Sequence, residues 1–353
     1  MQNDQIGKHG IEINKPDKLT SDMISTSQDA QKMNLHRVSH GGEGIMKRRY
    51  SRETVRENLE LYSIILPAII MIAIFSYVPL YGLLIAFQDY APGNAIVSFS
   101  QQAGIRWVGF KHFFKFINGP YFYRIMRNTI WLSFLNIIFG FTIPVIFALL
   151  LNEVKLTRFK KFVQTASYLP YFISMVVVAG MVLSFINING VFSKLVEVFG
   201  GTAQSYNTDP RYFSRIYTFT NVWKSFGFNS ILYLSAIAAV DTALYESAKL
   251  DGARRFQLMR YITIPSIKPT MAIMLILSVG SILSSNTDLI LLLYSPANYE
   301  RSDVIGTYIY RLGIEGGQFS YTTAIGLLAA VINFLMVFVA NKASDKITGA
   351  SLW

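Results

Sequence analysis

The stretch ESAKLDGARRFQLMRYITIPSIKP, residues 246–269, separates two long apolar runs of this chain, and five of its side chains are Lys or Arg. Glycine has no Cβ atom and permits a sharp reversal of the backbone. Asp251-Gly252 therefore predicts a break between two short helices, near 242–250 and 254–262. Such a charged pair of helices between apolar runs needs a role outside the lipid.

The apolar runs themselves predict membrane spans. The chain has 353 residues, of which 52% are hydrophobic and 15% charged, whereas soluble domains have nearer a quarter charged residues. A helix needs about 20 apolar residues to cross a bilayer. The fold class predicted is all-α, a polytopic membrane protein with six transmembrane helices, at 61–87, 128–151, 163–187, 216–240, 270–294 and 322–341. Lys224 and several polar residues interrupt the fourth run, so we expect protein rather than lipid around it.

The distribution of Lys and Arg predicts the orientation of these spans. With the N-terminus inside, segments 47–58, 152–161, 241–268 and 342–353 hold 16 Lys and Arg in 62 residues, against 10 in the 96 residues outside. Basic residues concentrate on the cytoplasmic side of membrane proteins. Both termini and the 246–269 loop are therefore expected in the cytoplasm. The same rule explains the net charge of +11 without a nucleic-acid partner.

The composition also predicts the domain organisation. Residues 1–45 are polar, with few aromatic side chains, and are expected to be a disordered cytoplasmic tail. Residues 46–60 form a basic juxtamembrane segment, and 61–341 form the six-helix transmembrane domain, with its charged loop at 241–268. Residues 342–353 are a short cytoplasmic C-terminal tail.

Motifs for catalysis are absent from the sequence. There is no cysteine, no GxxxxGK[ST] phosphate loop, no HExxH or GxSxG, and no pair of carboxylates in or near a span. His36 and His40 lack the companions that a metal site needs. We therefore expect no catalytic residue, no metal and no cofactor in this chain, which is not an enzyme by itself.

The 246–269 stretch resembles the EAA motif of ABC importer permeases, whose pattern is EAA-x3-G-x9-I-x-L-P. Five positions match at this spacing: Glu246, Ala248, Gly252, Ile262 and Pro265. Ser247 and Ile264 replace an Ala and a Leu of the pattern, with similar size or hydrophobicity. The stretch also lies before the penultimate span, where the family has its motif.

The resemblance implies a function for this loop. In the family the first helix, a coupling helix, docks in a groove on a separate ATPase, whose closure moves the spans between inward-open and outward-open states. The ATPase-coupling residues implied are Glu246, Ser247, Ala248, Asp251, Gly252, Ile262 and Pro265. Glu246 would offer its carboxylate to a basic residue of the partner. The alternative is a basic amphipathic loop that lies on the membrane surface.

The resemblance extends over about 59–341 and favours one branch of the family. YVPLYGLLIAFQDYAPG, RWVGFKHFFKF and NVWKSFGFNSILYLSAIAAVDTALYESAKLDGA look like permeases for oligosaccharides and polysaccharide fragments. This implies a bacterial plasma membrane protein that pairs with a second, homologous permease as a heterodimer. It also implies two ABC ATPase subunits, which bind the ATP and Mg²⁺, and an extracytoplasmic solute-binding protein that delivers the oligosaccharide.

Polar residues in the spans are candidates for the substrate path. Span five contains SSNTD, residues 284–288, from which we single out Ser285, Asn286 and Asp288. An ionisable residue within a span faces a wet cavity or a partner. Asp288 could bind sugar hydroxyls or pair with Lys224, and Lys224 could instead snorkel to the interface. The secondary candidates, each with packing or interhelical hydrogen bonding as its alternative, are Trp223, Asn229, Tyr171 and Asn333.

Three other functions stay open. The importer could take amino acids, polyamines or phosphate, although Asp288 and Lys224 are the mid-membrane charges found and favour a neutral, hydroxyl-rich cargo. An ion-coupled secondary transporter would need no ATPase-docking loop, and its typical inverted repeats, broken helices and buried acids are not evident from the sequence. A polytopic membrane enzyme is the third.

Overall fold

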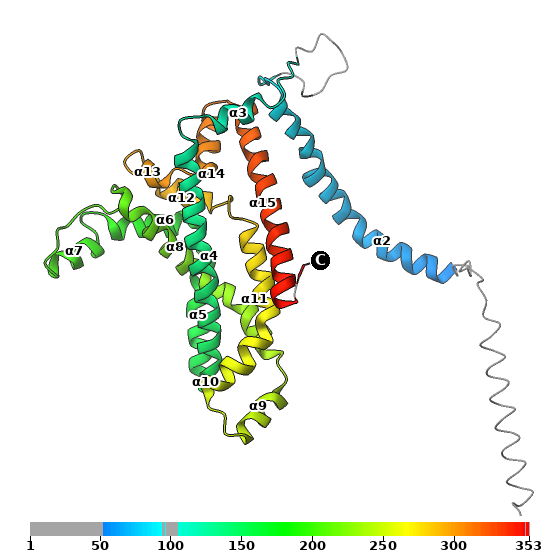
Figure 1. Cartoon of the computed structure of the whole chain (residues 1–353), viewed down its shortest axis with the longest axis vertical. Coiled ribbons are helices and arrows are strands. Elements are labelled where there is room, and N and C mark those ends of the chain that lie inside the picture. The colour runs from blue at the N-terminus through cyan, green and yellow to red at the C-terminus, as the bar shows by residue number, and fades with distance from the viewer. Residues whose placement is uncertain (1–51, 94–95, 97–104, 350, 353) are drawn as a thin grey trace, which may run out of the picture. The chain divides into compact units, whose positions relative to one another are not determined.

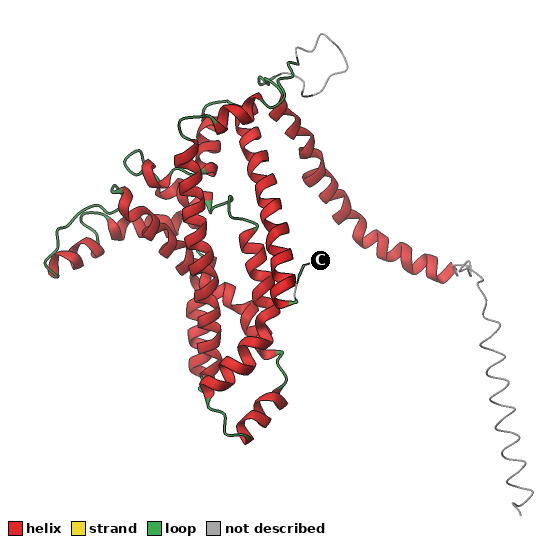
Figure 2. Cartoon of the chain, in the orientation of Figure 1, coloured by secondary structure: helices red, strands yellow, loops and turns green. Residues whose placement is uncertain are grey.

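The computed structural model describes residues 52–93, 96, 105–349 and 351–352. Every regular element in this part of the chain is a helix (Figures 1 and 2), and the only extended pairing is an isolated bridge between Gln88 and Trp107. The all-α prediction is therefore confirmed. The predicted tail, 1–45, and the basic segment up to residue 51 lie outside the described residues.

The chain divides into two units, residues 1–72 and 73–353. The described part of the first unit is one helix, α2 (Arg52–Ile72), which contains Pro67. The second unit begins with a π-helical segment, Ala73–Tyr77, and a 3₁₀ segment, Val78–Phe87. The predicted first span, 61–87, is thus helical throughout, and Leu61–Phe87 is apolar enough to cross a membrane.

The second unit contains the remaining helices. Their bounds are α3 (Lys111–Ile117), α4 (Phe122–Glu153), α5 (Thr157–Phe172), α6 (Met175–Ile186), α7 (Val191–Val198), α8 (Pro210–Ala238), α9 (Thr242–Leu250), α10 (Arg255–Leu258), α11 (Ile264–Val279), α12 (Thr287–Leu293), α13 (Tyr299–Ser302), α14 (Ile305–Ile309) and α15 (Phe319–Thr348). Helices α4 and α8 pack along each other, α5 packs on α8, and α15 packs on α11 and on the 3₁₀ segment. Within this unit, α9 and α10 lie at one end, and α3 and α14 at the opposite end (Figure 1).

The core forms layers along α4, which contributes to three buried clusters in order of its sequence. Ile125 belongs to a cluster with α14 and α15 at the end near α3. Leu132 belongs to a second cluster with α6, α8 and α12. Val145 belongs to a third with the end of α8 and the start of α11. Helix α4 therefore connects the two ends of the unit.

Among the described residues, five segments are long and apolar enough to cross a membrane. Besides Leu61–Phe87 they are Phe122–Glu153, Met175–Val198, Arg255–Val279 and Phe319–Lys346. Helix α8, which was predicted as the weakest span, reaches the required apolarity only together with α9, from which it is bent by 67°. It begins at Pro210, before the predicted start at 216, so Arg211 and Arg215 lie inside the helix.

Two predicted spans are not continuous helices. The run 163–187 breaks after Phe172, and Ser174 caps α6 by accepting a hydrogen bond from the backbone N–H of Val177 at 3.3 Å. The run 270–294 breaks between α11 and α12. Serine and asparagine side chains compete for backbone hydrogen bonds and so favour helix ends. The sequence analysis did not foresee these two breaks, and the capping side chains are their physical reason.

The second short helix, predicted near 254–262, is not a separate element either. Helix α10 continues through a π-helical turn, Met259–Thr263, into α11. Arg255–Val279 is therefore one long helix, and the charged stretch is its first part. The break at Asp251-Gly252 separates this helix from α9.

A glycine permits the close packing of α5 against α8. A Cβ atom at Gly227 would lie 2.1 Å from the carbonyl oxygen of Ser167, which is far inside van der Waals contact. The backbones of the two helices therefore touch at this point. Close approach through small residues is typical of helix packing in membranes.

Candidate functional site: the coupling loop and a polar break in span five

Helix α9 starts with a side-chain cap. Asp241 accepts a hydrogen bond from the backbone N–H of Ala243 at 2.9 Å, which satisfies one of the free donors of the first turn. No side chain of α9 is buried. Leu250 is 89% exposed and Leu244 is half exposed. The described part of this chain thus leaves the helix without a covering partner, although it carries apolar side chains.

The end of α9 explains the glycine of the motif. Gly252 has φ +81°, in the left-handed region that favours glycine. Its N–H bonds to the carbonyl of Lys249 at 3.0 Å, and the N–H of Ala253 bonds to the carbonyl of Ala248 at 2.9 Å. These two bonds define a Schellman helix end, in which glycine occupies the left-handed position.

A hydrogen bond links α9 to the long helix of span five. The hydroxyls of Tyr245 and Thr263 lie 3.0 Å apart, and Thr263 is buried. Thr263 ends the π-helical turn that connects α10 to α11, and Pro265 follows near the start of α11. Two connections therefore join α9 to the long helix of span five: the chain through the Gly252 turn and this bond.

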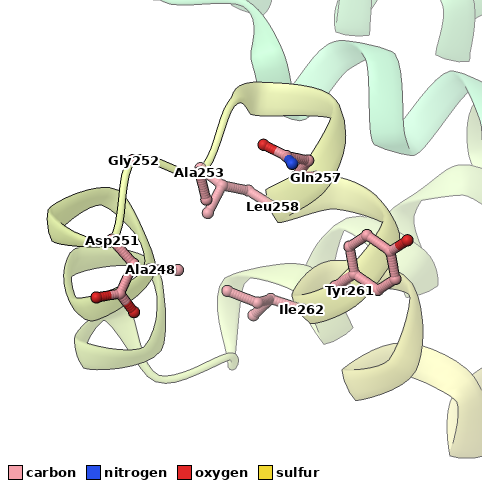
Figure 3. Close-up of a pocket in the computed structure, with 8 residues that line it drawn as sticks. All are labelled: Ala248, Asp251, Gly252, Ala253, Gln257, Leu258, Tyr261 and Ile262. Atoms are coloured by element: carbon pink, nitrogen blue, oxygen red, sulfur yellow. The ribbon is translucent and has the colours of Figure 1, made fainter.

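A cleft of about 250 Å³ separates α9 from the beginning of the long helix (Figure 3). Ala248 and Asp251 line it from the α9 side, and Leu258, Tyr261 and Ile262 line it from the other.

The predicted coupling residues all belong to this loop. Glu246 and Ser247 are exposed on α9, Asp251 and Gly252 form its end, and Pro265 is exposed at the start of α11. Glu246 makes no ion pair with any residue that the structure describes. Its contact with a partner stays a prediction.

The second part of the site is the break in span five. Gly280 ends α11, and Asn286 caps α12 by accepting a hydrogen bond from the N–H of Leu289 at 3.4 Å. Backbone groups at membrane depth need partners where no helix supplies them. Side chains of two other helices supply two of these partners. Asn333 of α15 accepts a hydrogen bond from the N–H of Leu283 at 3.0 Å. The hydroxyl of Tyr217 of α8 accepts one from the N–H of Asn286 at 3.2 Å.

Side chains around the break form a chain of hydrogen bonds across α4, α8 and span five. Asn286 donates to Asn221 of α8 at 2.9 Å, and Asn221 donates to Asn136 of α4. Ser285 and Ser133 of α4 lie 3.1 Å apart at their hydroxyls. Ser285 and Asn286, both predicted candidates, thus belong to one polar cluster, which we call the Asn221 cluster.

Asp288 and Lys224 do not form the ion pair considered from the sequence. Lys224 donates to the carbonyls of Pro170 at 3.3 Å and of Tyr171 and Ile173 at 2.7 Å each. Its charge stabilises the C-terminal end of α5, where free carbonyls carry partial negative charge. Asp288 lies exposed in the first turn of α12.

The secondary candidates are scattered. Tyr171 stacks on Phe228 at 3.9 Å between ring centroids, beside the break of span three. Trp223 lines a cavity between α4 and α8, and Asn229 is exposed on α8. Asn333, by contrast, donates to Ser284 at 2.9 Å and holds the break in span five. None of these placements tests contact with substrate.

Several residues of the site were missed by the sequence analysis. Those in the Asn221 cluster are Ser133, Asn136, Tyr217 and Asn221. Asn136 and Asn221 carry amide side chains inside apolar runs, and this feature of the sequence could have identified them as candidates. Tyr245 and Thr263 carried no comparable signal, because neither belongs to the motif pattern.

The opposite end of the unit carries a buried ionic cluster, also missed. Asp303 is fully buried and accepts from Arg124 at 3.1 Å and from Arg311 at 2.8 Å. Thr307 donates to the same carboxylate at 2.9 Å. The cluster joins the start of α4 to the segment around α14. A buried carboxylate needs such partners, so its role here is structural.

A second charged group follows the first span. Lys111 contacts Asp89 at 2.9 Å, and the Nε2 atom of His112 lies 3.2 Å from the same carboxylate. The hydrogen bond from Lys111 lowers the pKa of Asp89; burial opposes it, and the nearby charges lower the pKa further, so that the pKa lies below its ordinary value. This carboxylate therefore stays ionised at neutral pH and joins α3 to the end of span one.

Comparison with known proteins gives a family match over most of the transmembrane region. The model of the family described as "Binding-protein-dependent transport system inner membrane component" matches residues 140–348. The polygalacturonan/rhamnogalacturonan transport system permease protein YteP of Bacillus subtilis (strain 168) is 39% identical over 287 residues, which are 81% of this chain and 88% of that protein.

Solved structures agree with this match. A chain of a bacterial ABC transporter involved in the import of the acidic polysaccharide alginate is similar with a TM-score of 0.75 and 41% identity, over 84% of this chain and 98% of that one. A chain of the alginate transporter in complex with an alginate pentasaccharide-bound periplasmic protein gives a TM-score of 0.77 at 40% identity, covering 87% of this chain and 100% of that one.

Proposed function

The chain belongs to the family of binding-protein-dependent transport system inner membrane components, and on this basis we propose that it carries fragments of an acidic polysaccharide across the bacterial plasma membrane. It is a permease subunit of an oligosaccharide ABC importer, not an enzyme. Its relatives at 39–41% identity are named for polygalacturonan or alginate, both acidic. A neutral cargo was favoured from the sequence because Lys224 and Asp288 were the mid-membrane charges found. The acidic cargo is supported instead by the names of these relatives.

The energy for transport comes from separate subunits. Two ABC ATPases bind the ATP and Mg²⁺, and α9 docks in a groove on one of them. The observation that carries this proposal is α9 itself, which has no buried side chain and presents the predicted coupling residues Glu246 and Ser247 at its surface. Its Tyr245–Thr263 bond and Gly252 turn then move the long helix of span five.

The remaining partners follow from the same assembly. A second, homologous permease completes the translocation path, and an extracytoplasmic binding protein delivers the oligosaccharide at the end of the unit opposite α9. Both termini and α9 are cytoplasmic, as the density of Lys and Arg favours. Ser285, Asn286 and Asp288 face the path at the break in span five.

A panel of oligosaccharides tests the cargo. The importer is assembled in proteoliposomes from this chain, its second permease, its ATPases and its binding protein, and ATP hydrolysis is measured with each sugar. We expect galacturonate or alginate oligomers to stimulate hydrolysis at least about tenfold more than neutral arabino-oligosaccharides, which corresponds to about 1.4 kcal/mol. Stimulation by neutral sugars alone would refute the acidic cargo, and uptake without ATP would refute the importer.

A further inference from the structure

A cavity of about 450 Å³ lies between α4 and α8, and no residue of the Asn221 cluster lines it. It is lined from α8 by Arg215, Thr218, Phe219, Trp223 and Phe226, and from α4 by side chains that include Phe139. We call it the α4–α8 groove. Its lining is almost entirely apolar apart from one end.

The polar residues of the groove all lie toward the start of α8. Ser214, Arg215 and Thr218 come first along the helix, and the lining residues from Phe219 to Phe226 are apolar. Arg215 and Phe226 are separated by about 16 Å at 1.5 Å per residue. One leaflet of a bilayer has a hydrocarbon depth of about 15 Å, half of the full core. The groove thus has the length and the one-ended polarity of a lipid molecule.

Two unpartnered groups point to an occupant. The residue Thr218 is only 7% exposed, and its buried Oγ1 atom has no hydrogen-bond partner among the described residues. Buried hydroxyls nearly always have a hydrogen-bond partner. The neighbouring Thr220 follows this rule, because its hydroxyl donates to the carbonyl of Ile216 at 2.7 Å. Arg215 is exposed and makes no ion pair with any residue that the structure describes. Both groups lie at the polar end of the groove.

We propose that the α4–α8 groove binds an anionic phospholipid. The guanidinium of Arg215 pairs with the phosphate, the hydroxyl of Thr218 donates to an ester oxygen, and an acyl chain runs between Phe139, Trp223 and Phe226. Arginine matches phosphate oxygens in charge and geometry. A sugar fits poorly, because its hydroxyls would face apolar side chains and lose their hydrogen bonds.

The fluorescence of Trp223 allows a direct test, because the chain has only four tryptophans and the other three can be replaced. One variant keeps only Trp223, with Trp107, Trp131 and Trp353 changed to Phe, and a matched variant keeps only Trp131, which is about half exposed on α4 and does not line the groove. The full chain is placed in phosphatidylcholine vesicles, and brominated phosphatidylglycerol or brominated phosphatidylcholine is added as the quencher.

The expected result is a lipid preference at Trp223 alone. Brominated phosphatidylglycerol should reach half-maximal quenching of Trp223 at roughly fivefold lower content than brominated phosphatidylcholine, from one cation at the head group. Trp131 should show no preference. Arg215→Gln should remove the preference. Arg211→Gln, which removes the same charge one turn earlier where Arg211 pairs with Asp209 at 2.7 Å, should keep it.

Four results would overturn the proposal. Equal quenching of Trp223 by both lipids would mean ordinary contact with the bilayer. No quenching by either lipid would mean that protein covers the groove. Equal loss of preference in Arg211→Gln would mean a general effect of surface charge. Displacement of phosphatidylglycerol by a galacturonate oligomer would assign the groove to the cargo.

Discussion

Changing Glu246 to lysine should abolish ATP-driven uptake while the protein still folds and inserts in the membrane. Glu246 is exposed on α9 and contributes no ion pair within the described chain, so the fold does not depend on it. If its carboxylate pairs with a basic residue of the ATPase, reversing its charge turns attraction into repulsion. Loss of one partner of an interface charge pair costs about 2–5 kcal/mol. We therefore expect binding of the ATPase to weaken at least about 30-fold, at 1.4 kcal/mol per tenfold.

Co-purification of the ATPase with the tagged permease measures this directly. Asp345→Lys is the matched control, since Asp345 is an exposed carboxylate near the end of α15 and is predicted to face the cytoplasm as well. It should retain the ATPase. Glu246→Gln keeps the size of the side chain and should give an intermediate loss. Normal uptake and co-purification in Glu246→Lys would disprove the docking role.

The second large effect is expected at the centre of the Asn221 cluster. Asn221→Leu removes the hydrogen bond from the side chain of Asn286 and the one to Asn136, and it leaves the bond from the backbone N–H of Asn286 to Tyr217. Each interhelical hydrogen bond in a membrane contributes about 0.6–2 kcal/mol. The break between α11 and α12 then loses a support, so we expect a lower unfolding temperature and an uptake rate reduced at least about tenfold.

Ser235→Leu is the control on the same helix, because Ser235 is exposed and lies outside the cluster and the candidate substrate path. The uptake and the unfolding temperature of this variant should stay close to those of the unchanged protein. The two variants would be compared by thermal unfolding in detergent and by uptake in proteoliposomes. If Asn221→Leu behaved like Ser235→Leu, the cluster would have no part in transport.

The sequence was sufficient for features that depend on local rules. Helix α9, its end at Asp251-Gly252 and the first span follow from residue type and apolar length, which need no tertiary contacts. The Schellman end is an example, because the left-handed position of Gly252 is a property of the backbone.

The breaks in spans three and five could not be predicted in the same way. A hydropathy window averages over Ser174 and Asn286, while their caps and the bonds from Tyr217 and Asn333 exist only once the helices are packed. The role of Lys224 is similar, since its carbonyl partners belong to another helix, α5. Arg215 was missed because α8 begins at Pro210 and not at 216.

These breaks weaken one argument that the sequence offered against an ion-coupled transporter, namely the absence of broken helices. Broken helices were not evident from the sequence, yet spans three and five both have them. Their polar groups are mainly amides and hydroxyls, and the buried acid among the described residues, Asp303, belongs to the segment between α13 and α14. The choice of an ABC importer over an ion-coupled transporter therefore rests on the family match and on the exposed helix α9.

A single cysteine on α9 gives the most direct test of the central claim, because the chain has none of its own. Ser247→Cys places a thiol on the exposed surface of the helix. In inside-out vesicles stripped of ATPases, a membrane-impermeant maleimide should label this thiol, and added ATPase subunits should protect it. Labelling from the extracellular side of intact cells, or labelling that the ATPases do not reduce, would contradict the account.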